Sequence, residues 1–425
     1  MSGVPEGSPL TALPVEKRDV VVIGGGPAGM AAALGARRAG AGNVLLVERD
    51  RVLGGILNQC IHDGFGLFLY KETISGPEYA ERLAEDVARE GIAVKTGAMV
   101  LDLGPDRVLR LNAPDGYRLI RAGAIVLAMG CRERTREMIG LPGTRPAGVW
   151  TAGSAQALVN LQNLRIGSEA VILGSGDIGL IMARRLTFEG IKVKGVFEIM
   201  PWAGGLERNV RQCLKDFDIP LELGRTVVEI RGRERLSAVV TARVDEGRHP
   251  IPGTDAVVPC DTLLLSVGLI PENELSKRAG VVLSPLTGGA VVDETLMTSA
   301  EGVFSCGNVL HIHDVADGAS FEGFEAGKQA ADYALGRRSA CASFRVAAKG
   351  CVRYVLPQVL RRGADGAALR FRVARPARGL KVEARGILTG RVYGSRRFAR
   401  VVPSEMQRLV LRAPAEEDIE VDGHE

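Results

Sequence analysis

Short apolar runs separated by glycine-rich turns set the pattern at the start of the chain. Residues 20–23 are apolar, a G-x-G-x-x-G turn begins at Gly24, and the following stretch is rich in Ala and other small residues. A second apolar run at 44–47 ends in Glu48. This order predicts a buried strand, a tight turn, a closely packed helix and a second buried strand, which together form a βαβ unit.

The same pattern returns further along the chain. Residues 171–173 are apolar, a second G-x-G-x-x-G turn begins at Gly174, and an acid stands at Glu198. In both copies the acid lies 24 residues after the first glycine, so that matching parts are 150 positions apart. A fixed internal period indicates that one structural unit is present twice.

Each copy is followed by a polar hairpin-like stretch and by an apolar strand that ends in glycine. In the first copy the turn falls at 114–116 and the strand at 124–130, and in the second copy the strand falls at 262–268. We therefore expect each copy to be a βαβ core with a small antiparallel excursion.

The chain after the second copy changes character twice. Residues 285–338 do not begin a third copy, but they carry a strand-like segment at 302–305, a turn at 307–308 and a helix-compatible run at 322–334. We interpret them as the return of the chain that completes the first domain. From 340 to 425 alternating segments and many arginines favour a small β-sandwich.

The two glycine turns indicate dinucleotide binding. Residues without a Cβ let the backbone approach a pyrophosphate, which then faces the free N–H groups at the start of a helix. An acid at the tip of the next strand accepts hydrogen bonds from ribose hydroxyls and repels the 2′-phosphate of NADP. Glu48 and Glu198 occupy that place. The spacing alone does not say which copy holds which nucleotide.

Composition excludes several other classes of protein. Aromatic residues make up 4% of the chain and the net charge is +4, which disfavours nucleic acid as a partner. The apolar runs are far shorter than the ~20 residues of a membrane-spanning helix. Seven dispersed cysteines without a C-x-x-C pair argue against a metal cluster or a redox dithiol, and they suit a reducing, cytoplasmic compartment.

Three segments together resemble a known class of flavoprotein. They are VVVIGGGPAGMAAAL (20–34), AIVLAMG (124–130) and TSAEGVFSCGNV (298–309). They resemble the FAD-binding pieces of pyridine-nucleotide-dependent flavoprotein reductases of the thioredoxin reductase-like class, in the pyridine nucleotide-disulfide reductase superfamily. The second copy resembles the inserted NAD(P) domain of that class.

The resemblance implies a set of cofactor-binding residues. For FAD these are Gly24, Gly26, Pro27, Ala28, Gly29, Glu48, Arg49, Gly55, Ile56, Val100, Ala128, Met129, Gly130, Gly307, Asn308 and Ser320. For NAD they are Gly174, Gly176, Asp177, Ile178, Gly179, Glu198 and Gly268. In that class an acid follows the late glycine and binds the ribityl chain, and the next helix begins opposite the pyrimidine ring. Asn308 departs from the pattern, although an amide still donates and accepts hydrogen bonds.

The expected fold class is α/β, with two Rossmann-like three-layer domains and a small, mainly-β C-terminal domain. The expected limits are a disordered tail at 1–17, an FAD domain at 18–142 and 285–338, an NAD(P) domain at 143–284, and a β-rich domain at 340–425.

Four further segments suggest a narrower resemblance. They are GGILNQCIHDGFG (54–66), GPEYAERL (76–83), EIMPWAGGLERNVRQCL (198–214) and GNVLHIHD (307–314). These look like the oxidoreductases that are partner subunits of glycerol-3-phosphate dehydrogenase-like flavoenzymes. They are more distantly similar to subunits of opine oxidases, sarcosine oxidases and dye-linked proline dehydrogenases. The partner implied by this resemblance is a flavoprotein dehydrogenase subunit, with a small iron–sulfur protein as a further candidate.

Few side chains suggest chemistry of their own. Cys60 stands shortly after a pair of glycines, where larger disulfide reductases carry two cysteines, so a redox role is one interpretation and a buried structural thiol the favoured one. His311, His313 and Asp314 alternate, but a metal site needs three or four ligands, and we predict no metal. Beyond Glu198 the nearest arginine is Arg208, too far along to indicate NADP.

Three functional hypotheses remain open. The favoured one is an FAD-dependent oxidoreductase that exchanges electrons between NAD(H) and a partner subunit. The second is a self-sufficient reductase of a small disulfide, peroxide or quinone, with Cys60 as its catalytic residue. The third is a non-catalytic assembly subunit that retains bound nucleotides.

Overall fold

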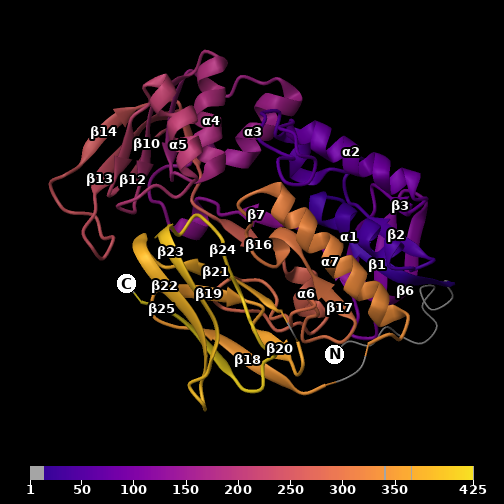
Figure 1. Ribbon diagram of the computed structural model, residues 1–425. Helices are drawn as coiled ribbons and strands as arrows, with labels where there is room; N and C mark the ends of the chain where they lie inside the picture. The colour runs from indigo at the N-terminus through magenta and orange to yellow at the C-terminus, as the bar shows by residue number, and fades with distance from the viewer. Residues whose placement is uncertain (1–13, 339–340, 365, 425) are drawn as a thin grey trace. The chain divides into compact units, whose positions relative to one another are not determined.

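The computed structural model describes residues 14–338, 341–364 and 366–424. It divides into two compact units, of which the first comprises Met1–Cys131 with Pro271–Glu425 and the second Arg132–Ile270. The second unit therefore begins and ends about a dozen residues earlier than the limits expected from the sequence. Both Rossmann-like folds and the mainly-β C-terminal region are present, as predicted (Figure 1).

The first unit contains a Rossmann-like sheet flanked by helices. Its strands are β1 Val15–Ile23, β2 Val44–Val47, β3 Ala93–Lys95, β4 Met99–Leu103, β5 Val108–Ala113, β6 Gly116–Leu127 and β17 Val303–Ser305. Its helices are α1 Pro27–Arg38, η2 Gly55–Gln59, α2 Gly76–Arg89, α6 Glu274–Arg278, η5 Gly307–Val309 and α7 Ala316–Ala334.

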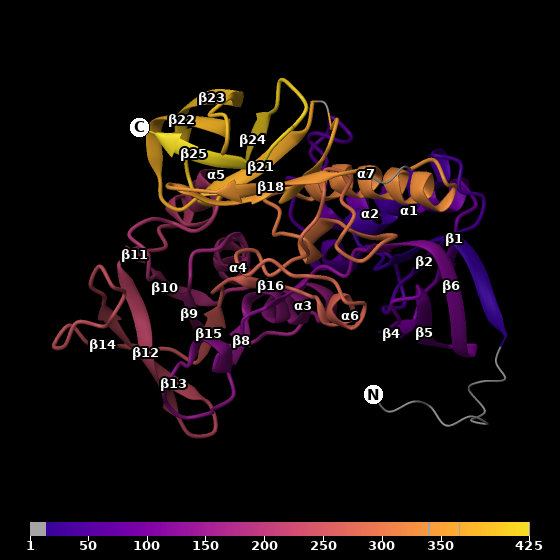
Figure 2. The ribbon, with the colours of Figure 1, turned by 90° about the horizontal axis from the view of Figure 1, so that it is seen from below.

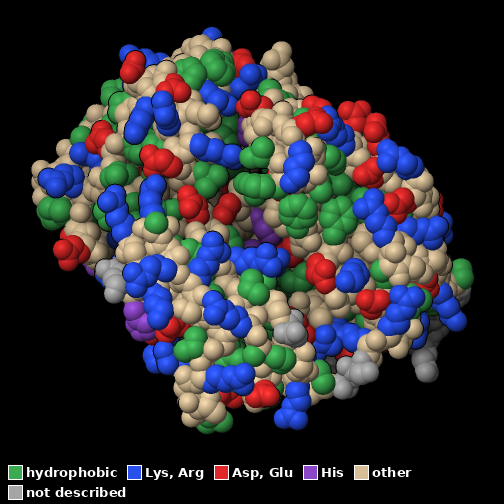
Figure 3. All heavy atoms as spheres, viewed as in Figure 1, with side chains coloured by type: hydrophobic (Ala, Val, Ile, Leu, Met, Phe, Trp, Pro, Cys, Tyr) green, Lys and Arg blue, Asp and Glu red, His purple; other side chains and the backbone are tan. Residues whose placement is uncertain are grey.

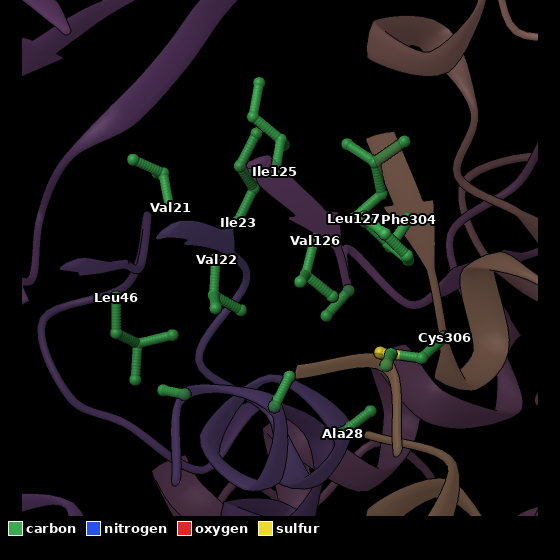
Figure 4. Packing of buried hydrophobic residues seen from close by; sticks show 14 of the residues in the cluster. Val21, Val22, Ile23, Ala28, Leu46, Ile125, Val126, Leu127, Phe304 and Cys306 are labelled. Carbon is green, nitrogen blue, oxygen red and sulfur yellow. The ribbon is translucent and has the colours of Figure 1, made fainter. Parts of the chain in front are cut away.

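The strand order of this sheet is β3-β2-β1-β6-β5-β4, and β17 also pairs with β6. The pairs β1–β2, β1–β6 and β17–β6 are parallel, so their carboxyl ends meet at one edge. The antiparallel hairpin between β5 and β6 turns where the sequence predicted. Figure 4 shows side chains from these strands, such as Val22, Leu46 and Val126, packed together with Phe304 from β17.

Small residues allow α1 and α7 to pack in close contact. A Cβ on Gly323 would lie 2.1 Å from the carbonyl oxygen of Ala28, and one on Gly327 would lie 1.8 Å from that of Ala32. Figure 2 shows the two helices running side by side along the sheet. This contact brings the late segment of the chain against the start of α1, where the first glycine turn lies.

One expectation about the N-terminus was wrong in part. Residues 15–17 were expected in a disordered tail, but they extend β1, where Val15 pairs with Leu119 and Lys17 with Arg121. The pairing partner lies some 100 residues away, which explains why local pattern did not reveal this end of the strand. The remainder of the expected tail, 1–13, lies outside the described residues.

The C-terminal region consists of two packed sheets, in agreement with the predicted sandwich. Their orders are β20-β18-β25-β22-β23 and β19-β21-β24, and apolar side chains from both fill one core. The strands are β18 Ser343–Ala348, β19 Val352–Leu356, β20 Val359–Arg361, β21 Ala368–Val373, β22 Ala377–Gly386, β23 Val392–Val401, β24 Gln407–Val410 and β25 Ile419–His424.

The second unit repeats the Rossmann-like arrangement. Its parallel sheet has the order β11-β10-β9-β15-β8, and a separate antiparallel sheet has the order β12-β13-β14. The elements are η3 Glu137–Ile139, β8 Val149–Thr151, α3 Ala152–Gln162, β9 Glu169–Leu173, α4 Asp177–Phe188, β10 Lys192–Glu198, α5 Glu207–Cys213, η4 Lys215–Phe217, β11 Leu221–Leu223, β12 Arg225–Gly232, β13 Leu236–Arg243, β14 Ala256–Pro259 and β15 Thr262–Leu265.

The chain passes between the two units twice, at β7 Cys131–Glu133 and β16 Leu269–Pro271, and these short strands pair with each other. Among the helices of the described residues, none is both long enough and apolar enough to cross a bilayer.

Candidate dinucleotide-binding sites

The first candidate site forms where β1 passes into α1. Gly24 has a φ of 107°, and a Cβ there would lie 2.3 Å from the carbonyl oxygen of Ala128. A Cβ on Gly29 would lie 1.7 Å from the Gly24 oxygen, whereas one on Gly26 would meet nothing within 4 Å. Close backbone packing therefore requires the first and third glycines, and the middle one leaves the start of α1 open to a phosphate.

Glu48, the predicted ribose ligand, follows β2 and lies behind this turn. It is 5% exposed, and its Oε2 accepts the N–H of Gly25 at 2.6 Å. Oε1 accepts the N–H of Asp50 at 2.7 Å. The Glu48 carbonyl accepts the N–H of Ala98 at 2.9 Å, so the chain leading into β4 also passes beside the acid. The carboxylate faces the glycine turn, where the ribose of a bound dinucleotide would lie.

The structure distributes the other predicted FAD residues between the turn and its surroundings. Pro27 and Ala28 begin α1. Arg49 is exposed next to the acid, whereas Val100 is buried in the core of the sheet, where only its backbone could approach a ligand. Residues 128–130 follow β6 at the same edge as the glycine turn.

A pair of glycines lies against the first turn. The N–H of Gly54 donates to the carbonyl of Gly25 at 2.8 Å, and a Cβ on Gly55 would lie 3.2 Å from the Cα of Gly26. Ile56, which follows, is 50% exposed. The segment therefore borders the open start of α1 without filling it.

The return segment reaches the same edge of the sheet. Gly307 follows β17, and a Cβ there would lie 2.6 Å from the Cβ of Ala28. Asn308 uses its Oδ1 to accept the N–H of His313 at 3.0 Å, and its Nδ2 lies 3.6 Å from the Sγ of Cys131. The amide that replaces the expected acid thus holds the loop that follows it, and it retains one N–H for a ligand.

Ser320 lies in the second turn of α7 and is fully buried. Its Oγ accepts the hydroxyl hydrogen of Tyr79 at 2.8 Å. In the first turn, Asp317 accepts the N–H of Leu69 at 3.0 Å. The start of α7 is therefore positioned by α2 and by the loop that precedes α2.

A buried carboxylate that sequence reasoning missed lies behind Gly307. Glu322 is 1% exposed, and its Oε2 accepts the Gly307 N–H at 2.8 Å. Its Oε1 lies 3.0 Å from the Nε2 of His311 and accepts from the guanidinium of Arg370 at 3.1 Å. The Nε2 of His313 lies 3.4 Å from Oε2. Donors from two segments, 307–313 and β21, thus surround one acid.

Burial and the neighbouring His313 lower the pKa of His311 to about 4, so its imidazole is neutral at pH 7. Burial opposes ionisation of Glu322, but His311 and His313 hold its pKa well below the usual range. The ligand atoms of these three residues lie within 4.8 Å of one another, so Glu322 is the third potential metal ligand that the sequence did not reveal. The guanidinium of Arg370 on the same carboxylate disfavours a cation there, because like charges repel.

Asp314, the remaining acid of this loop, faces the C-terminal region. Its Oδ1 accepts from the guanidinium of Arg372 in β21, and its Oδ2 accepts the N–H of Met406 at 2.6 Å. Arg372 also donates to the carbonyl of Ile312 at 3.0 Å. The β-rich domain therefore fixes the loop that leads into α7.

The second candidate site repeats the first at equivalent positions. Gly174 has a φ of 90°, and a Cβ there would lie 2.2 Å from the carbonyl oxygen of Ser266. Oε2 of Glu198 accepts the N–H of Ser175 at 2.8 Å and its hydroxyl at 2.6 Å, while Oε1 accepts the N–H of Met200 at 2.9 Å. The second carboxylate therefore faces its own turn.

The start of α4 is more occupied than that of α1. The Asp177 carboxylate accepts the N–H of Leu206 at 2.8 Å and the amide of Asn209 at 2.6 Å. The N–H of Gly179 donates to the hydroxyl of Ser266 at 3.1 Å. A phosphate here would meet a carboxylate and a hydroxyl besides the backbone.

The other predicted residues of the second site surround this helix start. A Cβ on Gly176 would lie 3.0 Å from the Oγ of Ser266. Ile178 is partly exposed in the first turn of α4. Gly268 has a φ of 106°, and its carbonyl accepts the N–H of Arg134 at 3.1 Å.

Cys60 does not have the properties of a reactive thiol. Burial raises its pKa to about 12, and its Sγ donates to the carbonyl of Ile56 at 3.3 Å. A nucleophilic or redox-active cysteine requires a lowered pKa, because the thiolate is the reactive form. The geometry therefore favours the structural interpretation over the redox one.

A second pair of glycines shares the internal period of the chain, and the motifs alone did not reveal it. Gly204 and Gly205 stand 150 positions after Gly54 and Gly55, the same offset as the two turns. In the structure, the N–H of Gly204 donates to the hydroxyl of Ser175 at 2.7 Å, so this pair borders the second turn as the earlier pair borders the first. The repeat therefore continues beyond the two acids. The 150-residue offset was the signal in the sequence that could have revealed the second glycine pair.

Comparisons with known proteins agree with this geometry. Hydrogen cyanide synthase subunit HcnB of Pseudomonas protegens is 26% identical over 327 residues, which cover 72% of this chain and 67% of that protein. An opine oxidase subunit of Agrobacterium tumefaciens is 27% identical over 283 residues, which cover 62% of this chain and 55% of that protein.

A solved structure shows the same fold. Thioredoxin reductase of T. acidophilum matches with a TM-score of 0.62 and 24% identity, over 75% of this chain and 99% of that one. The family model of pyridine nucleotide-disulphide oxidoreductases matches residues 18–323, which include both glycine turns and both acids. This chain belongs to the pyridine nucleotide-disulphide oxidoreductase family and is an FAD- and NAD(P)-dependent oxidoreductase.

Proposed function

We propose that this chain exchanges electrons between NAD(H) and the dehydrogenase subunit of a larger complex, with FAD as the intermediate carrier. The observation that supports it most is the pair of matched turns, each with its carboxylate bonded to the backbone N–H after the first glycine. When bound, FAD supplies the hydride and electron chemistry, and the protein's part is to hold and orient the two nucleotides.

The roles of the residues follow from their positions. In the first unit the open start of α1 takes the pyrophosphate of FAD, Glu48 takes its ribose, and Gly307 with the start of α7 borders the ribityl and flavin end. Glu322 holds the Gly307 N–H and so positions the turn without touching the cofactor. In the second unit Glu198 and the start of α4 take the corresponding parts of NAD.

NAD rather than NADP is the proposed nucleotide. Glu198 is 7% exposed, and its carboxylate accepts two N–H groups and one hydroxyl. A carboxylate held in this way accepts from ribose hydroxyls and repels a 2′-phosphate. Arg208, the arginine next in sequence, is exposed on α5.

A partner protein is the proposed electron acceptor or donor, in preference to a small disulfide. None of the seven cysteines, all of which lie within the described residues, is in a disulfide, and burial raises the pKa of Cys60. HcnB and the opine oxidase relative are both named as subunits, and this chain spans 67% and 55% of their lengths. By this reasoning the partner is a flavoprotein dehydrogenase subunit, with a small iron–sulfur protein as a second candidate. Cysteines outside disulfides suit the cytoplasmic location that we propose.

Anaerobic titration of the purified chain tests the proposal. We expect it to be yellow, to lose its flavin absorbance with NADH, and to react much more slowly with NADPH. Cys60→Ser should leave both reduction of the flavin by NADH and its reoxidation by an artificial electron acceptor unchanged, whereas a self-sufficient disulfide reductase would lose NADH-driven turnover of its disulfide. Retained FAD that neither NADH nor NADPH reduces would overturn the proposal in favour of an assembly role.

A further inference from the structure

Positive charge is concentrated in one part of the C-terminal domain. Between residues 375 and 412 the chain has ten Lys or Arg and two Asp or Glu, although the net charge of the whole protein is only +4. All ten basic side chains are exposed. They lie on β22, β23 and β24 and on the adjoining turns, and Figure 3 shows Lys and Arg side chains gathered over this region. We call it the basic hairpin face.

The strand register places like charges opposite each other on this face. Arg378 pairs with Arg400 and Lys381 with Arg397 along the antiparallel β22–β23 ladder. Directly opposed like charges destabilise a sheet. The carboxylate of Glu383 pairs with both Lys381 and Arg385, but within the described ranges neither Arg378 nor Arg397 forms an ion pair. The arrangement is unfavourable for the isolated domain, and an anionic partner would relieve it.

The tip of the same hairpin presents apolar side chains to water. Leu388 is 85% exposed and Ile387 is 52% exposed, and they are flanked by Arg385 and by Arg391, which pairs with Glu416. Burying such a side chain is worth about 1.5–3 kcal/mol, so the tip would gain by leaving water.

The tip is also rigid, so its apolar side chains stay in water rather than fold back. The backbone N–H groups of Leu388 and Thr389 donate to Oε2 of Glu417 at 2.7 Å and 3.0 Å. The N–H of Ile387 donates to the carbonyl of Asp418 at 2.9 Å. Little conformational entropy is then lost when the tip is buried.

We propose that the basic hairpin face binds an anionic lipid surface, with Ile387 and Leu388 entering the interface between headgroups and acyl chains. Lipid phosphates would neutralise Arg378 and Arg397, and the apolar tip would leave water beside Arg385 and Arg391. This binding is peripheral and requires no spanning helix. It is independent of cofactor chemistry, so its failure would leave the proposed function untouched.

Two features favour lipid over other polyanions. Binding of single-stranded nucleic acid relies on aromatic side chains that stack on bases, and the aromatic side chains of this face, Tyr393 and Phe398, are buried. An acidic protein would satisfy the arginines but gives no particular reason for a tip that exposes leucine and isoleucine while its backbone N–H groups are hydrogen-bonded. A bilayer satisfies both the charges and the tip.

Co-sedimentation of the full FAD-loaded chain with lipid vesicles tests the proposal. We expect binding to vesicles of phosphatidylglycerol and phosphatidylcholine in equal parts, no binding to pure phosphatidylcholine, and release at high ionic strength. Arg378→Gln with Arg397→Gln should weaken binding about 25-fold, since each basic residue near such a surface contributes about 1 kcal/mol, or roughly fivefold. Leu388→Ser should weaken it about tenfold.

A matched control removes two exposed charges from the second unit, Arg233→Gln with Arg243→Gln, and should bind as the unchanged protein does. Retained absorbance of bound flavin in the same samples shows that each variant is folded. Equal binding to both kinds of vesicle, or no effect of the paired β22–β23 substitutions, would overturn the proposal. So would binding to polyglutamate as tight as to the anionic vesicles together with no effect of Leu388→Ser, because that result assigns the face to an acidic protein.

Discussion

The two glycine turns use the same backbone device at positions 150 residues apart. The N–H of Gly24 donates to the carbonyl of Val47 at 2.8 Å, and the N–H of Gly174 donates to that of Phe197 at 2.7 Å. In each copy the acid that ends the second strand holds the residue after the first glycine. The hydrogen bond from the N–H after the first glycine to the acid has nearly the same length in the two copies, 2.6 Å to Glu48 and 2.8 Å to Glu198.

What surrounds the turns differs. The helix of the first turn is covered by α7, with Gly323 against the carbonyl of Ala28, and Gly307 adds a further turn beside it. The second turn has no equivalent cover among the described residues of its own unit, and Asp177 and Ser266 occupy part of its helix start. We infer that the backbone device supplies recognition in both copies, while its surroundings make the first site a permanent holder and the second an exchangeable one.

Substituting the first glycine of each turn should give the largest effects and separate the two roles. Gly24→Ala and Gly174→Ala both force a Cβ to about 2.2–2.3 Å from a carbonyl oxygen at a positive φ, which alone costs on the order of 1–3 kcal/mol. We expect Gly24→Ala to be colourless or insoluble. We expect Gly174→Ala to keep its flavin but to lose at least about 100-fold in the rate of reduction by NADH, as measured by stopped-flow absorbance.

The assignment of the two sites is wrong if the outcomes for Gly24→Ala and Gly174→Ala are the reverse of those expected. A yellow Gly24→Ala protein, or loss of flavin in Gly174→Ala, would show that the first copy is not the FAD site. Gly116→Ala, in the hairpin between β5 and β6, is a control with a similar φ of 107° and open space around its Cβ, so it tests backbone strain without steric overlap.

Local sequence was sufficient to predict the parts that this comparison shares. The turn, the helix and the acid are set by residues within about 25 positions of one another, so the motif and its spacing revealed both copies. The start of β1 was missed because residues 15–17 are held by strand pairing with 119–121. Pairing with a distant strand leaves no local pattern.

The cluster around Glu322 could not be predicted for a related reason. His311 and Glu322 are 11 residues apart and meet only because α7 turns one face to the loop, and Arg370 comes from β21 in the C-terminal region, 48 residues later. From the sequence alone, the two histidines were isolated candidates for a metal. Neither Glu322 nor Arg370 could be assigned to the histidines from the sequence, because only the folded chain brings α7 and β21 to that loop.

Glu322→Gln tests whether the cluster of donors around Glu322 contributes to stability and to FAD binding at the first site. An amide cannot accept from all four surrounding donors, and breaking a buried ionic group costs about 3–5 kcal/mol. We expect a loss of that order in the free energy of unfolding by urea, together with loss of FAD on dilution. Glu325→Gln, on the same helix but only partly buried, should change the stability by less than about 0.5 kcal/mol. Equal unfolding midpoints for the two variants would contradict the assigned role.

The pH dependence of stability should come from the first unit through His311. Its pKa in the folded protein is about 4, below its ordinary value of 6.5, so the unfolded chain binds the extra proton between these limits. Stability is therefore fully present above about pH 6.5 and falls as the pH drops towards 4, by about 2 kcal/mol at pH 5. Urea unfolding at pH 7 and pH 5 measures the difference, and His311→Gln should remove most of it. An unchanged slope in that variant would assign the proton to another group.

The smallest predicted effect concerns the two carboxylates themselves. Glu198→Gln keeps an acceptor for a ribose hydroxyl but removes the charge that repels a 2′-phosphate, so we expect the ratio of NADPH to NADH activity to rise about tenfold, or roughly 1.4 kcal/mol. The matched Glu48→Gln should leave this ratio unchanged and weaken FAD retention instead, as seen by fluorescence of released flavin. If Glu48→Gln shifted nucleotide preference as Glu198→Gln does, the two copies would share one ligand, and the separation of a permanent from an exchangeable site would be wrong. Both acids accept the same pair of backbone hydrogen bonds, and Glu198 accepts the hydroxyl of Ser175 in addition, so the ligand that each turn receives is what should distinguish the two variants most.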